Sequence, residues 1–288
     1  MKSVLRRLGR FLPTKLVLYI DYGRSYKKVL NLSNPKYFGE KIQWIKLNGK
    51  LERFGKYVDK YEVRKYVESQ VGDRYLVKLY GVYKCPEEID FSKLPEKFVI
   101  KITNGNSTNI ICRDKSKLNI KSTIKTLKKW QKMKLYKYTK EMQYKNLNPD
   151  IICEEYLEEE TGSLRDYKFH CSNGKAKMIM VYTDRFIDFK CNYYDLEWKD
   201  YGINGKLEKF AYIEKPESLE EMISISEILA KNFPYVRVDL YLVKGKVYFG
   251  ELTLTPANGT RPYYPLEKDI ELAKMIDIDE YRVGFTNV

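Results

Sequence analysis

The chain has 288 residues, of which 53 are Lys or Arg and 39 are Asp or Glu, and its formal net charge is +14. With 43% hydrophobic and 32% charged residues, its composition excludes a disordered, collagen-like or membrane-embedded protein. A chain of this length buries a sizeable core, either as one large domain or as two lobes that share a hinge.

The positive charge is concentrated in two segments. Residues 113–145 contain twelve Lys and Arg against two acidic residues, a net charge of +10, and residues 1–31 contain eight against one, a net charge of +7. Such segments contact phosphate, anionic polymers or membrane surfaces, or they form solvated helix faces. We find no nucleic-acid-reading motif and therefore expect no nucleic-acid partner.

Cysteine usage and the N-terminus bear on location. The five cysteines are an odd number, widely spaced and without a C-x-x-C pair, so we expect reduced, buried thiols in a cytoplasmic protein. No stretch reaches the roughly 18 apolar residues of a membrane span, and the first residues do not form a secretory signal. They do form a helical stripe that faces either the core or, as a peripheral contact, an anionic membrane at its inner face. The apolar residues of this stripe are Val4, Leu5, Leu8, Phe11 and Leu12.

In chain order, the first 75 residues are predicted to be helical, with helices at about 34–48 and 56–69. The next segments alternate as strands at 97–103 and 108–112, joined by an Asn-Gly turn. The basic segment 117–145 is predicted to be one long helical stretch, and residues 151–157 form another strand. The buried stripe expected on this basic helix consists of Ile120, Ile124, Leu127 and Trp130.

Strands dominate the second half. Residues 167–171 and 176–182 flank Ser-Asn-Gly-Lys, a strong hairpin signal. A helix at 217–232 is predicted to begin with a capping box formed by Ser218 and Glu221. A second hairpin follows at 235–255, and residues 266–276 form a short helix. No linker or internal repeat is present, so the predicted class is α+β.

The last hairpin carries charges at an informative spacing. A three-residue turn at 244–246 would place Asp239 opposite Glu251 and Arg237 opposite Thr253, all on one face of the sheet. Opposed like charges destabilise a strand pair unless a cation lies between them, and hard oxygen ligands suit Mg²⁺ that holds a nucleotide phosphate. The alternative is a pair of salt-bridged surface carboxylates. A two-residue turn would shift the register by one and remove the argument.

Three further segments carry candidate residues. Lys101 lies on a strand that runs into a small amide-rich turn, an arrangement that could hold phosphates or be an ordinary hairpin. The apolar strand at 151–157 runs into Glu154 and Glu155, which fits a binding site or a plain strand end. Lys60 follows Asp59 before a helix and would be unremarkable alone.

Taken in their order along the chain, these candidate residues resemble the pattern of the ATP-grasp superfamily. The resemblance is closer to its teichuronopeptide-biosynthesis (TupA-like) family. The resemblance covers nearly the whole chain and rests on four motifs. These are NPKYFGEKIQWIKL at 34–47, DKYEVRKYV at 59–67, DYKF at 166–169 and GELTLTP at 250–256.

The resemblance implies an ATP-grasp fold in which two α+β lobes sandwich ATP after a short helical N-terminal region. The implied divisions are a helical region at 1–75, a smaller lobe at 76–155 with the phosphate turn and the basic helix, and a larger lobe at 156–288 with the metal-binding hairpin. Lys60 and Lys101 would contact the ATP phosphates.

The implied ATP site has two further parts. A phosphate-covering turn would consist of Gly105, Asn106 and Ser107. The adenine site would be lined, mostly through backbone groups, by the strand exit of Glu154, Glu155, Tyr156 and Leu157.

The implied catalytic groups lie in the second half of the chain. Asp239 and Glu251 would hold Mg²⁺, and Arg237 would stabilise the transferring phosphate. Lys168 would also face the phosphates. Thr253 stands where many ATP-grasp enzymes carry Asn, and its hydroxyl is a poorer magnesium ligand than an amide oxygen.

The reaction implied by this family uses ATP and Mg²⁺ to join a carboxylate to an amine through an acyl phosphate. The partners would be an amine or amino acid and an anionic sugar, a uronic acid of a capsular or cell-wall polysaccharide. This chemistry needs no general-base histidine, which agrees with a structural role for His170, the single histidine. Two alternatives stay open: a glycosyltransferase that uses Asp277-Ile-Asp279, and a non-catalytic module that binds anionic glycan.

Overall fold

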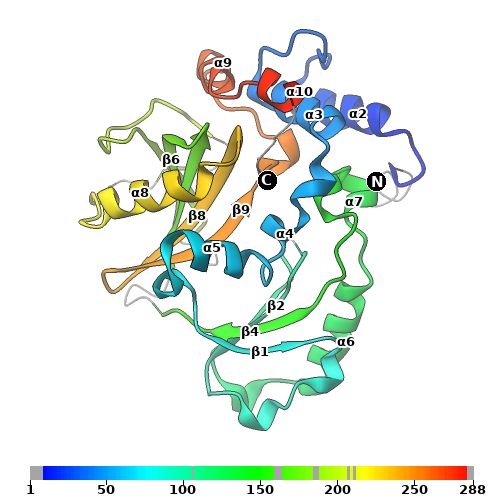
Figure 1. Ribbon diagram of the computed structural model, residues 1–288, viewed down its shortest axis with the longest axis vertical. Coiled ribbons are helices and arrows are strands. Elements are labelled where there is room, and N and C mark those ends of the chain that lie inside the picture. Colours follow the sequence, from blue (N-terminus) through cyan, green and yellow to red (C-terminus); the bar gives the residue numbers. More distant parts are fainter. Residues whose placement is uncertain are drawn as a thin grey trace.

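The computed structural model describes residues 9–105, 107–158, 164–183, 188–205, 208–209 and 212–283. Asn106 and the first part of the N-terminal stripe therefore lie outside the described residues. The chain forms a four-stranded and a five-stranded antiparallel sheet, each packed with helices, so the predicted α+β class is confirmed. The five-stranded sheet and its helices form the upper body in Figure 1, which we call the larger lobe. The four-stranded sheet and helix α6 lie below it and form the smaller lobe.

Helices come first, as predicted. They are α2 (Thr14–Tyr26), α3 (Phe38–Asn48), η1 (Leu51–Phe54), α4 (Gly55–Val58), α5 (Val63–Val71) and η2 (Asp73–Tyr75). The inward face of α3, with Phe38, Ile42 and Ile45, is at most 2% exposed. These side chains share one hydrophobic core with the larger sheet. The helical region therefore packs as part of the larger lobe.

The single helix predicted at 56–69 is wrong, because α4 and α5 are separated by a turn. The buried Asp59 side chain accepts the backbone N–H groups of Tyr61 and Glu62 at 2.9 and 3.0 Å. A short carboxylate that competes for nearby backbone N–H groups favours such a turn over a helix interior. The interruption leaves Lys60 outside both helices.

The smaller lobe is built on β1 (Leu79–Tyr83), β2 (Phe98–Ile102), β3 (Asn109–Cys112) and β4 (Ile151–Glu155), in the order β1-β4-β2-β3. Short 3₁₀ turns connect its elements at η3 (Pro86–Glu88), η4 (Phe91–Lys93) and η5 (Lys115–Lys117). Alternation along β2 and β4 sends one set of side chains, including Phe98, Ile100 and Cys153, into a core with α6. The opposite set carries Lys101 and Glu154.

The basic segment is less helical than predicted. It contains α6 (Ile120–Gln131), α7 (Tyr136–Thr139) and η6 (Met142–Tyr144), with irregular segments between them. Leu127 of the predicted stripe is fully buried, but Ile120 is 44% exposed and does not belong to the buried face. Ile120 is the first residue of α6, after the Asn119 cap, and therefore lies at the edge of the packed face.

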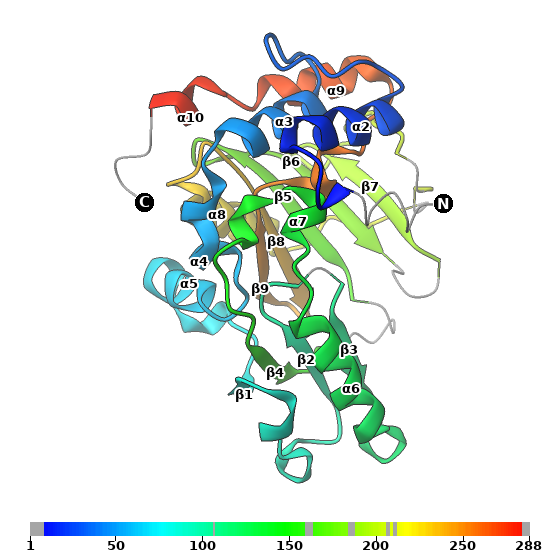
Figure 2. The same cartoon turned by 90° about the vertical axis from the view of Figure 1, so that its right-hand side faces the viewer.

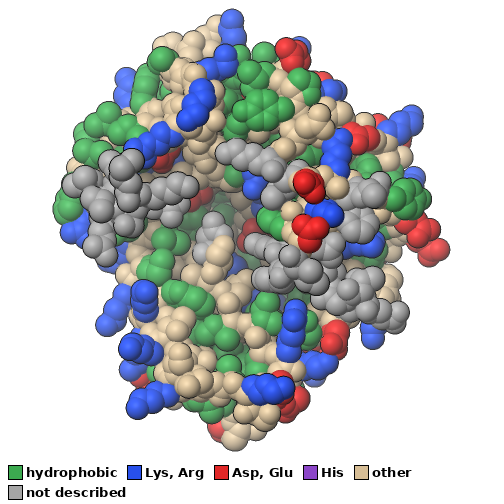
Figure 3. All heavy atoms as spheres, turned by 180° about the vertical axis from the view of Figure 1, so that it is seen from behind, with side chains coloured by type: hydrophobic (Ala, Val, Ile, Leu, Met, Phe, Trp, Pro, Cys, Tyr) green, Lys and Arg blue, Asp and Glu red, His purple; other side chains and the backbone are tan. Residues whose placement is uncertain are grey.

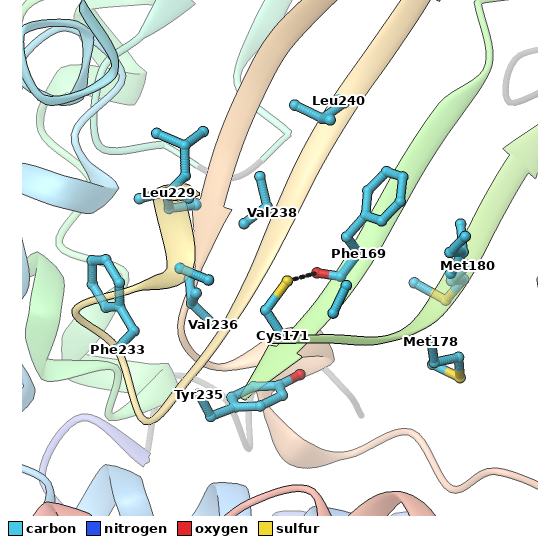
Figure 4. Packing of buried hydrophobic residues seen from close by; sticks show 14 of the residues in the cluster. Phe169, Cys171, Met178, Met180, Leu229, Phe233, Tyr235, Val236, Val238 and Leu240 are labelled. Atoms are coloured by element: carbon cyan, nitrogen blue, oxygen red, sulfur yellow. Dashed lines mark hydrogen bonds between the residues drawn. The ribbon is translucent and has the colours of Figure 1, made fainter. Parts of the chain in front are cut away.

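The larger sheet has the order β7-β6-β5-β8-β9. Its strands are β5 (Asp166–Ser172), β6 (Lys175–Thr183), β7 (Lys190–Tyr194), β8 (Tyr235–Val243) and β9 (Lys246–Thr253). Helix α8 (Leu219–Ala230) covers one face, where Leu229 and Phe233 pack against Val236, Val238 and Cys171 (Figure 4). The capping box predicted for α8 is wrong, because the Ser218 side chain makes no hydrogen bond to the helix.

The C-terminal segment packs back on the N-terminal helices. It contains η7 (Pro256–Gly259), α9 (Leu266–Lys274) and α10 (Asp279–Val283), and Figure 2 shows α9 beside α2 and α3 at one end of the larger sheet. Asp269 joins these segments by accepting the backbone N–H groups of Phe38 and Tyr263 at 2.7 and 2.9 Å and the Tyr26 hydroxyl at 2.9 Å.

The state of the cysteines and the character of the helices bear on the predicted cytoplasmic location. All five thiols are free, and four are buried, whereas Cys85 is half-buried. No helix in the described ranges has the length and apolar character needed to cross a bilayer.

Candidate active site

Charged residues occupy alternate positions on the two central strands of the larger sheet. Lys168 of β5 pairs with Asp239 of β8, and His170 pairs with Arg237. Because directly paired residues point to the same side of a sheet, these four side chains share the face opposite α8. Intervening residues such as Phe169, Cys171, Val236 and Val238, drawn in Figure 4, pack in the core on the α8 face.

The next strand extends this charged face. Glu251 of β9 lies opposite Asp239, and Thr253 lies opposite Arg237, which confirms the predicted pairing. The sequence therefore correctly predicted that a second carboxylate faces Asp239 across the hairpin.

The reason offered for that pairing is wrong. The turn has only two residues, Lys244 and Gly245, with φ of 50° and 75°, as in the turns that match the twist of a hairpin. A two-residue turn alone would misplace Glu251 by one position, but the register shifts between Asp239 and Leu240. Gly250 is the extra residue of this β-bulge, and it restores the pairing.

The ion pairs on this face are short and buried. Arg237 donates to Asp239 from Nε at 2.6 Å and from a terminal nitrogen at 2.7 Å, while Lys168 Nζ contacts Asp239 Oδ2 at 2.5 Å. Arg237 also donates to Thr253 Oγ1 at 3.1 Å and lies 3.5 Å from Glu251 Oε1. Asp239 therefore accepts from two cations, and one of them extends toward Glu251.

These contacts set the charge states. Burial raises the pKa of Asp239, but Arg237 and Lys168 outweigh it and hold that pKa below its usual range. Burial lowers the pKa of Lys168, yet Asp166 and Asp239 raise it above its usual value. All these groups are therefore ionised at neutral pH.

The smaller lobe presents a second ion-pair cluster. Lys101 Nζ lies 2.6 Å from Glu154 Oε2, and Arg64 of α5 donates to Glu154 Oε1 at 3.1 Å. Arg64 also donates to the Val77 carbonyl oxygen at 2.8 Å. Glu154 is 5% exposed, so its carboxylate fixes both cations beside the sheet.

Lys60 is attached to the turn between β2 and β3. Its backbone N–H donates to the Thr103 carbonyl at 2.9 Å, and its Nζ donates to the Gly105 carbonyl at 2.6 Å. Burial, aided by the Lys101 charge, lowers the pKa of Lys60, while Glu251 of the larger lobe opposes this shift. Lys101 and Glu251 thus both lie within electrostatic reach of Lys60.

The turn itself has the geometry of a tight, small-residue loop. A Cβ on Gly105 would lie 1.8 Å from Thr108 Oγ1, so no larger residue fits there. Ser107 has φ of 57°, a conformation uncommon for residues other than glycine. Asn106 lies outside the described part of the chain.

A small pocket lies between the smaller-lobe cluster and β9 of the larger lobe. Lys101 and Glu154 of the smaller sheet line it together with Lys60 and Arg64 of the helical region, and β9 closes the other side. The β9 residues of this pocket are Phe249 and Gly250, the residues at the bulge. The molecular face drawn in Figure 3 is hollowed between the two lobes, with Lys and Arg side chains on the smaller lobe below.

The strand exit after β4 is placed beside this pocket but not within it. The Glu155 backbone N–H donates to the Lys78 carbonyl at 2.9 Å, and alternation directs its side chain away from Glu154. The Tyr156 hydroxyl accepts from Arg113 Nε at 3.0 Å, and Leu157 is half-buried. The adenine-binding role of these residues stays a prediction.

The donor set of the larger lobe fits a shared magnesium ion. Asp239 and Glu251 offer carboxylate oxygens on one face, and the Glu251 side chain is 43% exposed. The Thr253 hydroxyl donates to Glu251 at 3.2 Å and accepts from Arg237, so it positions Glu251. No group of three or more His, Cys, Asp or Glu residues forms a complete metal site in the described ranges. One or two carboxylates that leave room for phosphate oxygens and water are typical of Mg²⁺.

Sequence reasoning missed Arg64 and Asp166. Arg64 lies four residues after Lys60, a helical spacing that could have indicated a shared side, but its partner Glu154 is 90 residues away. Asp166 lies 3.8 Å from Lys168 in the DYKF motif, two positions along one strand face. His170, expected to be structural, is buried beside the Tyr235 hydroxyl, with 2.8 Å to Nδ1. Burial lowers the pKa of His170 well below its usual value, so the ring is neutral.

The chain is similar to known ATP-grasp proteins. The family model described as TupA-like ATPgrasp matches residues 40–277. No curated protein matches the chain. An ATP complex of D-alanine–D-alanine ligase from Bacillus anthracis is similar at 17% identity and a TM-score of 0.47, with 85% of this chain and 68% of that chain covered.

Two other solved structures are similar in the same way. The ATP-grasp ligase PsnB, in complex with a phosphomimetic precursor variant, Mg and ADP, has 8% identity and a TM-score of 0.42, covering 85% of this chain and 65% of that chain. Phosphoribosylamine–glycine ligase from Thermotoga maritima has 14% identity and a TM-score of 0.42, covering 82% and 57%.

The fold and the family match together define the class of protein: this is an ATP-grasp ligase. Within that class, the chain belongs to the TupA-like ATP-grasp family, whose model covers most of its length. The resemblance inferred from the four sequence motifs is thereby confirmed.

Proposed function

We propose that this ligase uses ATP and Mg²⁺ to join an amine or amino acid to the carboxylate of a uronic acid in a capsular or cell-wall polysaccharide. Family membership supports carboxylate–amine ligation. The basic segment at 113–145 supports an anionic acceptor. Free thiols and the use of ATP support a cytoplasmic location. The peripheral membrane contact stays a prediction, because residues 1–8 lie outside the described ranges.

One observation carries the proposal: cations gather beside β9, the strand that carries Glu251. Lys60 and Lys101 line the small pocket that β9 closes, where the Glu251 charge opposes the lowering of the Lys60 pKa by burial, and Arg237 lies 3.5 Å from Glu251 on the charged face of the larger sheet. Cations of this kind bind phosphates and neutralise the charge that develops during phosphoryl transfer. The carboxylates Asp239 and Glu251 supply the hard oxygens for Mg²⁺.

The roles of the residues follow from their positions. Lys60 and Lys101 bind and orient the phosphates, while Glu154 holds Lys101 in place through its ion pair. Arg237 faces the transferring phosphoryl group, and Lys168 keeps Asp239 ionised and oriented. When bound, Mg²⁺ neutralises phosphate charge and holds the phosphates in register.

The reaction balances without a histidine. A substrate carboxylate oxygen takes the terminal phosphoryl group of ATP, and ADP departs. The amine nitrogen then attacks the acyl carbon of the resulting acyl phosphate, inorganic phosphate leaves, and the amine loses a proton to solvent. Orientation and charge stabilisation supply the rate enhancement.

No observation favours the two alternatives. The Asp277 side chain accepts the Asp279 backbone N–H at 2.9 Å in a local turn beside α10, far along the chain from the charged pocket. A glycan-binding module would not need buried cations such as Arg237 and Lys168, which share the carboxylate of Asp239 on the inside of a lobe.

The product that distinguishes these functions is ADP. Purified protein with Mg²⁺, ATP, a uronic acid and a mixture of amino acids should release ADP and phosphate only when both the carboxylate and the amine are present. Release of AMP and pyrophosphate would overturn the acyl-phosphate route. Binding of a UDP-sugar without binding of ATP would favour the glycosyltransferase.

A further inference from the structure

A second and much larger cavity lies beside the phosphate turn. It has a volume of about 350 Å³, within the size range of small-molecule sites. Asn104, Gly105 and Thr108 of the turn form one wall, and the segment from the end of α6 to Pro149 forms the rest. This cavity is separate from the small charged pocket, although Gly105 connects the two: its carbonyl accepts the Lys60 ammonium group.

The lining combines aromatic rings, accessible amides and lysines. The rings are Trp130, Tyr136 and Tyr144, all half-buried. Asn104 is half-buried at the cavity, and Asn146 and Asn148 are exposed, so their side-chain amides are accessible to a ligand there. Among the residues that the structure describes, Thr108 Oγ1 is buried without a partner. A buried, unpaired hydroxyl is costly unless a ligand supplies hydrogen bonds.

Two features tie the cavity to the reacting groups. Burial raises the pKa of the Tyr144 hydroxyl well above its usual value, and Glu141 and Glu251 raise it further, so this ring lies in the field of the larger-lobe carboxylate. The segment is also fixed to the end of β9, because Thr255 Oγ1 donates to Glu141 at 2.6 Å and accepts from Gln143 Nε2 at 2.8 Å.

We propose that this cavity binds the acceptor sugar, a hexuronate residue whose ring lies against the aromatic side chains and whose hydroxyls bond to the accessible amides. Its carboxylate would point toward Gly105 and the phosphate turn. Lys134 and Lys145, both exposed at the cavity, pair with the carboxylates of neighbouring residues in an oligomer. This assignment rests on the proposed function, because it names the acceptor of that reaction.

Binding without turnover tests the assignment. Calorimetric titration of the full chain with a trimer of galacturonic acid, in the absence of ATP and amine, should show saturable binding that weakens with salt. The methyl-esterified trimer, which lacks the charges, should bind at least several-fold more weakly. Lys134→Gln with Lys145→Gln should weaken the acid trimer about tenfold, as expected for the loss of two partly screened ion pairs.

The matched control is Lys121→Gln with Lys125→Gln, which removes the same charge from exposed positions of α6 outside the cavity. An equal loss of trimer affinity in both double variants would overturn the cavity assignment, because it would indicate nonspecific electrostatic attraction. Nucleotide that competes with the trimer for the cavity would also overturn it. Trimer binding in a protein that releases no ADP would leave the cavity assigned and refute the ligase function, so the two failures are distinguishable.

Discussion

Asp239 and Glu251 face each other across a hairpin, but their surroundings differ. Asp239 is 1% exposed and accepts from both Arg237 and Lys168. Removal of its charge would leave two buried cations without their partner, which costs several kcal/mol. The Glu251 side chain is 43% exposed and can be replaced at little cost to the fold. Glu251 is therefore the cleaner position at which to test the magnesium site.

Substitution at the two positions should separate catalysis from stability. We expect Glu251→Gln to reduce ADP release by about a hundredfold or more, as for loss of a group that acts on transition-state charge, with the unfolding free energy unchanged within about 0.5 kcal/mol. Asp239→Asn should lose activity and also about 3–5 kcal/mol of stability. Coupled-enzyme assay and urea denaturation measure both quantities. Normal turnover in Glu251→Gln would remove it from the site.

Asp269 predicts a pH dependence that is independent of catalysis. Burial, together with the nearby Glu40 charge, raises the pKa of Asp269 from 3.8 to about 6. Because the folded protein holds this proton more tightly than the unfolded chain, its contribution to stability is fully present below pH 4 and is lost as pH rises through 6. This difference between the folded and unfolded pKa corresponds to at most about 3 kcal/mol.

The test compares how the unfolding free energies of two proteins change with pH. Urea denaturation of the wild type and of Asp269→Asn at pH 4.5, 5.5 and 6.5 should show that the stability advantage of the wild type shrinks as pH rises. Other titrating groups contribute equally to both proteins and cancel in the difference. Parallel pH profiles would contradict the raised pKa of Asp269.

At the scale of elements, two irregularities place the candidate residues. The bulge at Gly250 keeps Glu251 and Thr253 on the charged face of β9, and the break at Asp59 keeps Lys60 beside the phosphate turn. Both are small departures from regular structure that direct a side chain toward the pocket. Such bulges are typical near active sites.

Insertion of one alanine between Gly250 and Glu251 should remove activity by changing the register. The added residue would take the place opposite Asp239, and the Glu251 side chain would point to the α8 face. We expect ADP release to fall below detection, together with a loss of stability because a charge would enter the core. Gly245→Asn is the matched control in the same hairpin, since Asn tolerates the positive φ of 75°. It should retain activity, and an active insertion variant would refute the role of the β9 register.

At the scale of the whole molecule, the positive charges lie at two different sites, the large cavity and the small pocket. The segment 113–145 supplies the cavity lysines Lys134 and Lys145, while the half-buried cations of the small pocket come from elsewhere in the chain. Lys60 links the two lobes. It follows helices that pack on the larger sheet, and its side chain donates to the Gly105 carbonyl in the turn of the smaller lobe. Nucleotide held by Lys60 would therefore bridge both lobes.

Nucleotide should stabilise the entire chain through this bridge. At a concentration of 100 times its Kd, Mg-ATP should raise the unfolding free energy by about 2.7 kcal/mol. Lys60→Ala should need at least tenfold more nucleotide for the same rise in thermal melting. The control Lys65→Ala, at an exposed position of α5, should behave as the wild type. Equal nucleotide responses in the two variants would exclude Lys60 from phosphate binding.

The sequence by itself determined the features that depend on local periodicity. Alternating strands, the Asn-Gly and Lys-Gly hairpins and the face of α3 follow from neighbouring residues, whose propensities and spacing act within a few positions. The pairing of Asp239 with Glu251 belongs to this group because one short hairpin joins them. Its stated cause was wrong, since a single-residue bulge in β9 has little signal beyond one glycine.

Tertiary structure alone decided the rest. Arg64, Lys101 and Glu154 meet because β4 lies between β1 and β2, an order that does not follow the chain, and no local pattern encodes such a crossover. The same is true of the 350 Å³ cavity, whose walls come from the phosphate turn and a segment about 25 to 45 residues further on. The candidate residues were readable from sequence, but their ion pairs arise only where separately folded segments pack together and exclude water.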